Sequence, residues 1–121
     1  MKELRWKWVE HKGKRILHVD YRRLRSDEIL LLINESINVV LASPGPVRLL
    51  GNIGDAGVSP AVMKEMKKLG GTILRQKLEK TAVVGVTGVN GVFFDAYVAV
   101  AGQDTVRKFE TEKEALDWLS E

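Results

Sequence analysis

The chain contains no cysteine, only three prolines and no long uninterrupted apolar run. Without cysteine, disulfides, thiolate zinc sites and cysteine nucleophiles are excluded, as is common in reducing compartments. The apolar run from Val92 to Ala101 contains Asp95 and is shorter than the ~18 residues of a membrane span. The first residues alternate in polarity and lack the apolar core of a secretory signal. We therefore expect a cytoplasmic protein with no membrane span and no cofactor.

A strong excess of charge of one sign is also lacking, because 19 basic residues face 16 acidic ones, for a net charge of +3. The charge is unevenly spread: residues 1–25 carry nine Lys or Arg against three acids, and residues 104–121 carry six acids against three bases. Opposite charge at the two ends is more typical of a solvated surface or a self-complementary contact than of nucleic-acid binding. We expect no specific nucleic-acid partner.

Alternating apolar residues predict an N-terminal β-hairpin. A two-residue period over residues 4–10 places Leu4, Trp6 and Trp8 on one face of a strand. A second strand is expected over Arg15–Tyr21, after a short glycine turn. The two tryptophans are expected either to pack on the helices or to contact a partner subunit.

Helices and strands are predicted to alternate after the hairpin. Apolar residues recur at helical spacing in some segments and run continuously in others, and capping residues mark the helix starts. In chain order, the expected elements are a helix capped by Ser26 and ended by Ser43–Pro46, a strand over Val47–Ile53, a helix capped by Ser59 with Pro60 first, a strand over Thr81–Thr87, a helix over Val92–Ala101, a strand over Thr105–Phe109 and a helix capped by Thr111.

This alternation predicts an α/β fold. Strands separated by helices require a mostly parallel sheet, here of four to five strands with about four helices, edged by the antiparallel hairpin. The buried strand over Val47–Ile53 is expected at the centre of the sheet. No linker or shift in composition divides the sequence, so residues 1–121 are expected to form a single domain.

Four segments carry a resemblance to a known family. In this order and spacing, they are "GKRILHVDYRRL", "VSPAVMKEMKKLG", "KTAVVGVTGVNGVFFDAYVAVAG" and "VRKFETEKEALDWL". Together they resemble the SpoIIAA-like group of STAS-related bacterial proteins over essentially the whole chain. The resemblance implies a cytoplasmic STAS-like α/β domain that is not an enzyme.

The resemblance also implies two kinds of function. In related anti-sigma-factor antagonists, a partner kinase phosphorylates a serine in an Asp-Ser-Ser-Gly loop; this sequence lacks that tetrapeptide, and its nearest positional match is Ser59. The architecture is also similar to lipid-transfer domains of the CRAL-TRIO type, which suggests an apolar ligand. We expect a non-enzymatic regulatory domain that binds a protein partner or forms a homodimer. The alternative is a carrier of a small apolar or anionic molecule.

Two glycine-rich bends are the candidate binding loops: the first bend, residues 54–59, and the second bend, residues 85–91. Each follows a predicted strand, and the carboxyl ends of parallel strands lie at one edge of a sheet. We therefore expect the two bends to meet and to frame a crevice for a ligand or partner. The expected crevice residues are Asn52, Gly54, Asp55, Gly57, Ser59, Gly85, Thr87, Gly88, Asn90 and Gly91.

Ser59 has two interpretations. Directly before Pro60, its hydroxyl is well placed to cap the helix, which contributes about 1 kcal/mol. The same position at a helix start would also stabilise an added phosphate, so Ser59 is a candidate phosphorylation site. Capping is the commoner role for a serine at this position.

No catalytic or metal constellation is evident in the sequence. His11 and His18 belong to the hairpin, and no acid or serine stands at a spacing typical of a triad or metal site, so they are interpreted as ordinary histidines. Asp20, Asp55 and Asp95 could serve acid–base chemistry but are not paired by spacing. The sequence therefore predicts no enzyme and no metal site.

Overall fold

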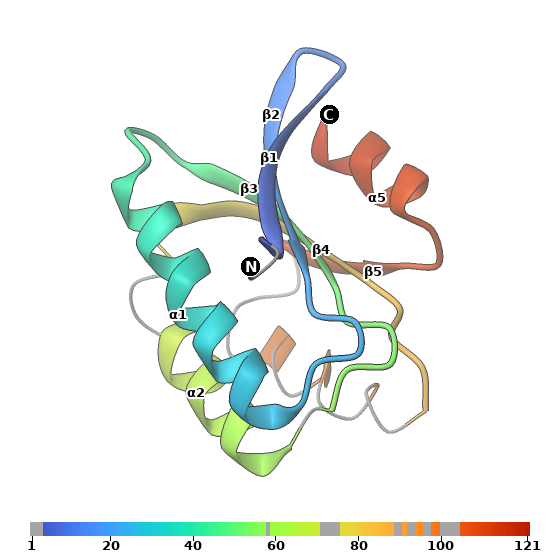
Figure 1. Ribbon diagram of the computed structural model, residues 1–121. Coiled ribbons are helices and arrows are strands. Elements are labelled where there is room, and N and C mark those ends of the chain that lie inside the picture. Colours follow the sequence, from blue (N-terminus) through green and yellow to red (C-terminus); the bar gives the residue numbers. More distant parts are fainter. Residues whose placement is uncertain are drawn as a thin grey trace.

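The computed structural model describes residues 4–57, 59–70, 76–88, 91, 94–95, 98–99 and 105–121 (Figure 1). Within this part of the chain, five strands and three helices follow one another. In chain order they are β1 (Trp6–His11), β2 (Lys14–Asp20), α1 (Ser26–Ala42), β3 (Val47–Asn52), α2 (Pro60–Gly70), β4 (Leu78–Val84), β5 (Val106–Phe109) and α5 (Glu112–Leu119).

The five strands form one sheet with the order β1-β2-β3-β4-β5. β1 pairs with β2 in antiparallel fashion, and every later pair is parallel. The hairpin turn is tight because Lys12 and Gly13 adopt positive φ angles of 51° and 80°. The prediction of a mostly parallel sheet, with an antiparallel hairpin at one edge and the strand from Val47 at its centre, is confirmed.

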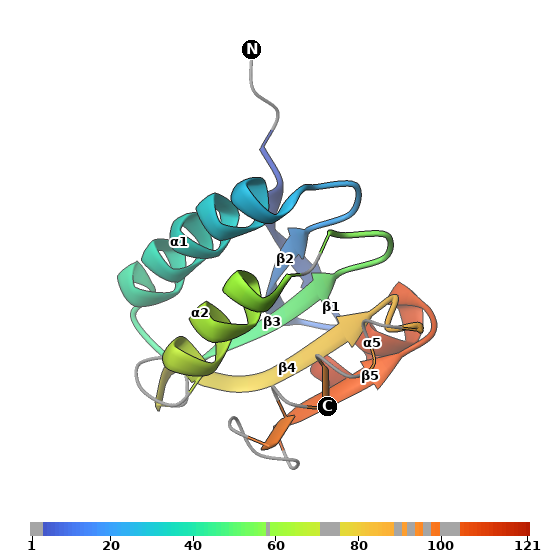
Figure 2. The same cartoon turned by 90° about the horizontal axis from the view of Figure 1, so that it is seen from below.

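Helices cover both faces of the sheet, as Figure 2 shows: α1 and α2 lie on one face and α5 on the other. Successive side chains along a strand point to opposite faces of the sheet, so each strand contributes residues to both helical layers. Ile16 packs in a cluster with Trp118 and Leu119 of α5, whereas the next residue, Leu17, packs with Leu32 and other residues of α1. Trp6 and Trp8 pack against the same cluster as Leu17 and Leu32, so the prediction that they pack on the helices is confirmed.

The predicted helix caps are confirmed in two of three cases. The Ser59 hydroxyl accepts a hydrogen bond from the amide of Val62 at 3.4 Å, and the Thr111 hydroxyl accepts one from the amide of Glu114 at 3.2 Å. The cap predicted at Ser26 is wrong, because Ser26 is already the first helical residue and Arg25 stands at the cap position. The Glu28 carboxylate there accepts a hydrogen bond from the Arg25 amide at 3.0 Å.

The strand boundaries differ most from the prediction in β1 and β4, and by one residue in the other strands. Leu4 lies outside β1 and is 71% exposed, so it does not share the buried face of the tryptophans. β4 spans Leu78–Val84 rather than Thr81–Thr87, because Gly85 turns the chain with a φ of +89° directly after it. The helix predicted over Val92–Ala101 lies mostly outside the described residues.

Candidate functional site

The two bends meet where β3 and β4 end side by side. A Cβ atom placed on Gly85 would lie 2.6 Å from the Gly54 nitrogen and 2.7 Å from the Gly54 Cα atom, so only glycine permits this approach. The prediction that the bends come together at one edge of the sheet is therefore confirmed. Backbone atoms fill the space between these two glycines, and a ligand has no room there.

Hydrogen bonds hold the predicted crevice residues Asn52, at the end of β3, and Gly57 and Ser59 of the first bend. The Asn52 side chain is buried; its oxygen accepts from the Gly54 amide at 3.1 Å. The Gly57 amide donates to the Leu24 carbonyl at 2.8 Å, which packs the bend against the segment that precedes α1. The Ser59 hydroxyl is half-buried and lies 2.5 Å from the Ser26 hydroxyl.

The second bend is more open. Thr87 and Gly88 are exposed, and a Cβ atom on Gly88 or Gly91 would meet no atom within 4 Å. The Gly91 amide donates to the Gly88 carbonyl at 3.0 Å. Asn90 lies outside the described residues. The structure thus joins the two bends through Gly54 and Gly85, whereas Gly88 and Gly91, the described glycines farther along the second bend, make no such close approach.

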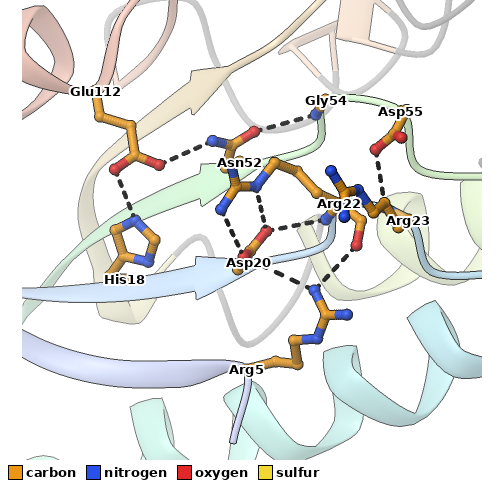
Figure 3. Close-up of polar contacts among 9 residues, drawn as sticks. All are labelled: Arg5, His18, Asp20, Arg22, Arg23, Asn52, Gly54, Asp55 and Glu112. Carbon is orange, nitrogen blue, oxygen red and sulfur yellow. Dashed lines mark hydrogen bonds and ion pairs between the residues drawn. The ribbon is translucent and has the colours of Figure 1, made fainter. Parts of the chain in front are cut away.

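A third segment, residues 20–25, completes this edge of the sheet, and we call it the arginine turn (Figure 3). Asp20 ends β2, and its carboxylate accepts three hydrogen bonds from Arg22: one from the amide at 3.0 Å and two from the guanidinium at 2.9 and 3.0 Å. Arg5 donates to the Arg22 carbonyl at 2.9 Å. The hydrogen bond from the Arg22 side chain lowers the pKa of Asp20, and its counterpart raises the pKa of Arg22.

Arg23 connects the arginine turn to the first bend. Its φ of 65° is in the left-handed region, which is uncommon for a long side chain. The Arg23 amide donates to the Asp55 carboxylate at 2.9 Å, and this contact between residues 32 positions apart holds the unusual conformation. The predicted site residue Asp55 is thus an anchor for the turn.

Glu112 brings the start of α5 to the same edge. Its carboxylate lies 3.1 Å from the Nε2 atom of His18 and accepts a hydrogen bond from the Asn52 side-chain amide at 2.8 Å. Partial burial opposes ionisation of this carboxyl, but the hydrogen bonds from Asn52 and His18 outweigh it and lower the pKa of Glu112. Figure 3 shows His18, Glu112, Asn52 and Gly54 as a chain of contacts from β2 to the first bend.

His11 makes a second pair with α5, away from this edge. Its Nε2 atom lies 2.8 Å from the Asp117 carboxylate, which also contacts Lys12 at 3.2 Å and Lys113 at 3.1 Å. These bonds, that from His11 above all, lower the pKa of Asp117. Both histidines therefore join the hairpin to α5, and these two contacts with distant acids add to the sequence interpretation of ordinary histidines. Sequence spacing missed the acids because they lie about 100 positions away.

A polar cleft with a volume of about 570 Å³ opens between β1, the arginine turn, the first bend and Glu112. The residues that line it are mostly charged or polar, with Leu4 and Trp6 as the apolar ones. The polar ones are Arg5, Lys7, His18, Asp20, Arg22, Arg23, Asp55 and Glu112. Of the predicted crevice residues that the structure describes, only Asp55 lines this cleft, which lies beside the first bend.

The cleft could have been predicted from the positions of polar residues relative to the ends of the predicted strands. Residues that end or directly follow β2, β3 and β5 all lie at the carboxyl edge of the parallel part of the sheet, whatever their spacing in the sequence. Asp20 and Arg22, Asn52 and Glu112 each stand at such a position. No group of three or more His, Asp or Glu residues that could hold a metal ion occurs within the described residues.

The comparisons with known proteins identify the fold. No protein-family model and no curated protein matches the chain. The crystal structure of an uncharacterized protein of the DUF3478 family from Shewanella loihica PV-4, with a SpoIIAA-like fold, is similar with a TM-score of 0.69 and 15% sequence identity, over 94% of this chain and 91% of that one. None of the helices in the described ranges is long and apolar enough for a membrane span. The chain therefore has the SpoIIAA-like α/β fold that its sequence resemblance predicted.

Proposed function

We propose that this chain is a non-enzymatic binding domain that holds a small polar molecule in the polar cleft. The observation that carries the proposal is the position and character of this cleft. It lies at the carboxyl ends of parallel strands, where open α/β sheets bind ligands. Its volume of about 570 Å³ is in the range of small-molecule sites, and its mostly charged lining favours a polar ligand over an apolar one.

The state of the cleft carboxylates supports a binding role without catalysis. Hydrogen bonds from Arg22 lower the pKa of Asp20, and Glu112 also has a lowered pKa despite its partial burial. Both groups are therefore ionised at neutral pH and hold no proton to donate. Their oxygens are already occupied by neighbouring donors, which makes them poor general bases.

A second candidate function is a regulatory contact with a protein partner at the same end of the molecule. Leu4 and Leu31 are 71% and 56% exposed and line a groove of about 290 Å³ that shares Leu4 and Arg5 with the polar cleft. Exposed leucines beside a charged cleft are typical of interaction surfaces. A co-purifying partner that is released by Leu31→Lys, and not by Leu41→Lys, would favour this function.

Phosphorylation of Ser59 stays a prediction. The Ser59 hydroxyl is bonded to the Ser26 hydroxyl at 2.5 Å and to the Val62 amide at 3.4 Å. A phosphate on this oxygen would have to displace Ser26, so modification would loosen the contact between the starts of α1 and α2. Mass spectrometry after incubation with a cell lysate and ATP tests it; a protein that stays unmodified would contradict it.

Isothermal titration calorimetry tests the leading proposal. The wild-type chain is titrated with four small polar molecules of different charge: inorganic pyrophosphate, citrate, spermidine and trehalose. We expect saturable 1:1 binding of at least one, loss of that binding in Arg22→Ala, and unchanged binding in Lys64→Ala on α2. The proposal is overturned if none of the four binds, if binding survives Arg22→Ala, or if the bound molecule is chemically converted.

A further inference from the structure

We propose that the polar cleft selects a small molecule with two or more negative charges on phosphate or carboxylate oxygens. The inference rests on the proposed function, because it names the ligand class of the same cleft. In this account Lys7 and Arg23 bind the ligand directly, and Arg22 adds the N–H groups that it does not use within the protein.

The acidic side chains of the cleft are already paired. Asp20 accepts three hydrogen bonds from Arg22, Glu112 is bonded by His18 and Asn52, and Asp55 accepts from the Arg23 amide. A cationic ligand would have to compete with these internal donors. The cleft therefore offers few strong acceptors to a guest.

The basic side chains are used much less. Within the described part of the chain, neither the Lys7 ammonium nor the Arg23 guanidinium makes a hydrogen bond or an ion pair. Arg22 donates two hydrogen bonds from its guanidinium to Asp20, and its other guanidinium N–H groups can donate to a ligand. A cleft whose donors are in surplus and whose acceptors are occupied fits an oxyanion, because charged N–H groups bind carboxylate and phosphate strongly.

The two cations without an ion pair suggest how many negative groups the ligand carries. Four basic side chains line the cleft, namely Arg5, Lys7, Arg22 and Arg23, against three carboxylates. Arg5 lies 3.7 Å from Asp20, so the two cations without an ion pair are Lys7 and Arg23. The net charge of the lining side chains is +1 with His18 neutral, and Lys7 and Arg23 offer a ligand with two negative groups one ion-pair partner for each group.

The arginine turn is already fixed for this role. Asp55 holds the Arg23 amide at 2.9 Å, and Arg5 holds the Arg22 carbonyl at the same distance from the other side. Figure 3 shows the turn between these two anchors. Because the backbone is held before a ligand arrives, less conformational entropy is lost on binding than in a mobile loop.

The decisive experiment is a titration with the four probes named above in wild-type protein and two double variants. Lys7→Gln with Arg23→Gln removes the two unpaired cations of the cleft. Lys64→Gln with Lys67→Gln removes two exposed cations of α2 and is the matched control, because the net charge of both variants is the same. Equal midpoints of urea unfolding verify that both variants keep the fold.

We expect wild-type protein to bind pyrophosphate or citrate, and to bind them more weakly as sodium chloride is raised, because salt screens exposed charges. The cleft variant should lose about tenfold or more in affinity, and the α2 variant should change less than about twofold. Preference for pyrophosphate over citrate assigns a phosphate ligand, and the reverse assigns a carboxylate ligand.

Two results would overturn the inference: stronger binding of spermidine or trehalose than of either anion, or equal weakening in both double variants. The first result would leave the proposed binding function standing and reject only the ligand class. Absence of binding by all four probes would instead reject the proposed function itself.

Discussion

The same edge of the sheet is built in two different ways on its two sides. Where β3 and β4 end, Gly54 and Gly85 bring backbone against backbone and leave no space for a guest. Where β2 ends, the arginine turn is held by side chains, through Asp20 and Asp55, and by the backbone bond from Gly57 to Leu24. The first side is packed, and the second side opens into the polar cleft.

The packed side therefore fixes the strand ends, and the open side provides the groups that can bind a ligand. A backbone contact between glycines carries no side-chain chemistry, but it fixes the ends of two central strands. The open side carries the charged groups, and Asn52 joins the two sides by bonding Gly54 on one and Glu112 on the other. Changes on the packed side should therefore cost stability, whereas changes on the open side should mainly affect binding.

Gly85→Ala should give the largest effect, because it breaks the packed side. The new Cβ atom would overlap the Gly54 backbone at 2.6 Å, and alanine is strained at a φ of +89°. We expect a loss of about 4 kcal/mol in the free energy of unfolding, measured by urea denaturation. Gly88→Ala is the matched control, since Gly88 also has a positive φ but no neighbour within 4 Å. Similar losses in both variants would contradict the close packing.

Asn52→Ala should have the next largest effect, because it removes the side chain that links the packed side to the open side. The buried side-chain amide bonds both the Gly54 amide and the Glu112 carboxylate, and its removal takes one hydrogen bond from each of these partners. We expect a loss of about 2 kcal/mol by urea denaturation. Asn34→Ala, an exposed position on α1, should change stability by less than about 0.5 kcal/mol. A neutral result for Asn52→Ala would show that the two sides are not coupled.

Asp55→Ala should loosen the open side with a smaller effect on stability. Loss of the bond to the Arg23 amide should lower stability by about 1 kcal/mol and speed hydrogen exchange of that amide, measured by NMR. Asp55→Asn is the control, because its side-chain oxygen still accepts a hydrogen bond. If the Arg23 amide exchanges at the same rate in Asp55→Ala as in the wild type, Asp55 does not anchor the turn.

The smallest effect concerns the pH dependence of the open side. The pKa of Glu112 is lower in the folded protein than its usual 4.5, so its contribution to stability is complete above that value. It is lost as the pH falls through the lower pKa of the folded state. Glu112→Gln should therefore cost less than about 1 kcal/mol at pH 7, and this difference from wild type should shrink in acid. Glu35→Gln on α1 should show no such change, and a difference that grows in acid would contradict the assignment.

Much of the packed side was predictable from sequence, because local rules decide it. Apolar periodicity identified the strands, and the two glycine-rich bends were expected to meet at one edge of the sheet, as they do. The crevice expected between them is filled by the backbone contact of Gly54 with Gly85. The Ser59 and Thr111 caps followed from residue type and spacing. These features depend on residues a few positions apart.

The open side was not predictable in the same way. The pairs of His18 with Glu112 and of His11 with Asp117 join residues about 100 positions apart, and a single sequence does not show which acid reaches which histidine. The Arg23 conformation is imposed by Asp55, 32 positions later, and not by its own preference. Long-range contacts of this kind are set by strand order, which periodicity leaves undetermined.

The most direct test of the central claim, that this edge binds through its open side, is a map of backbone amide shifts in an NMR titration with inorganic pyrophosphate. The account predicts that the shifts concentrate in residues 5–7 and 20–25, with little change at Gly85 and Gly88. Shifts confined to the second bend, with the arginine turn unchanged, would contradict it.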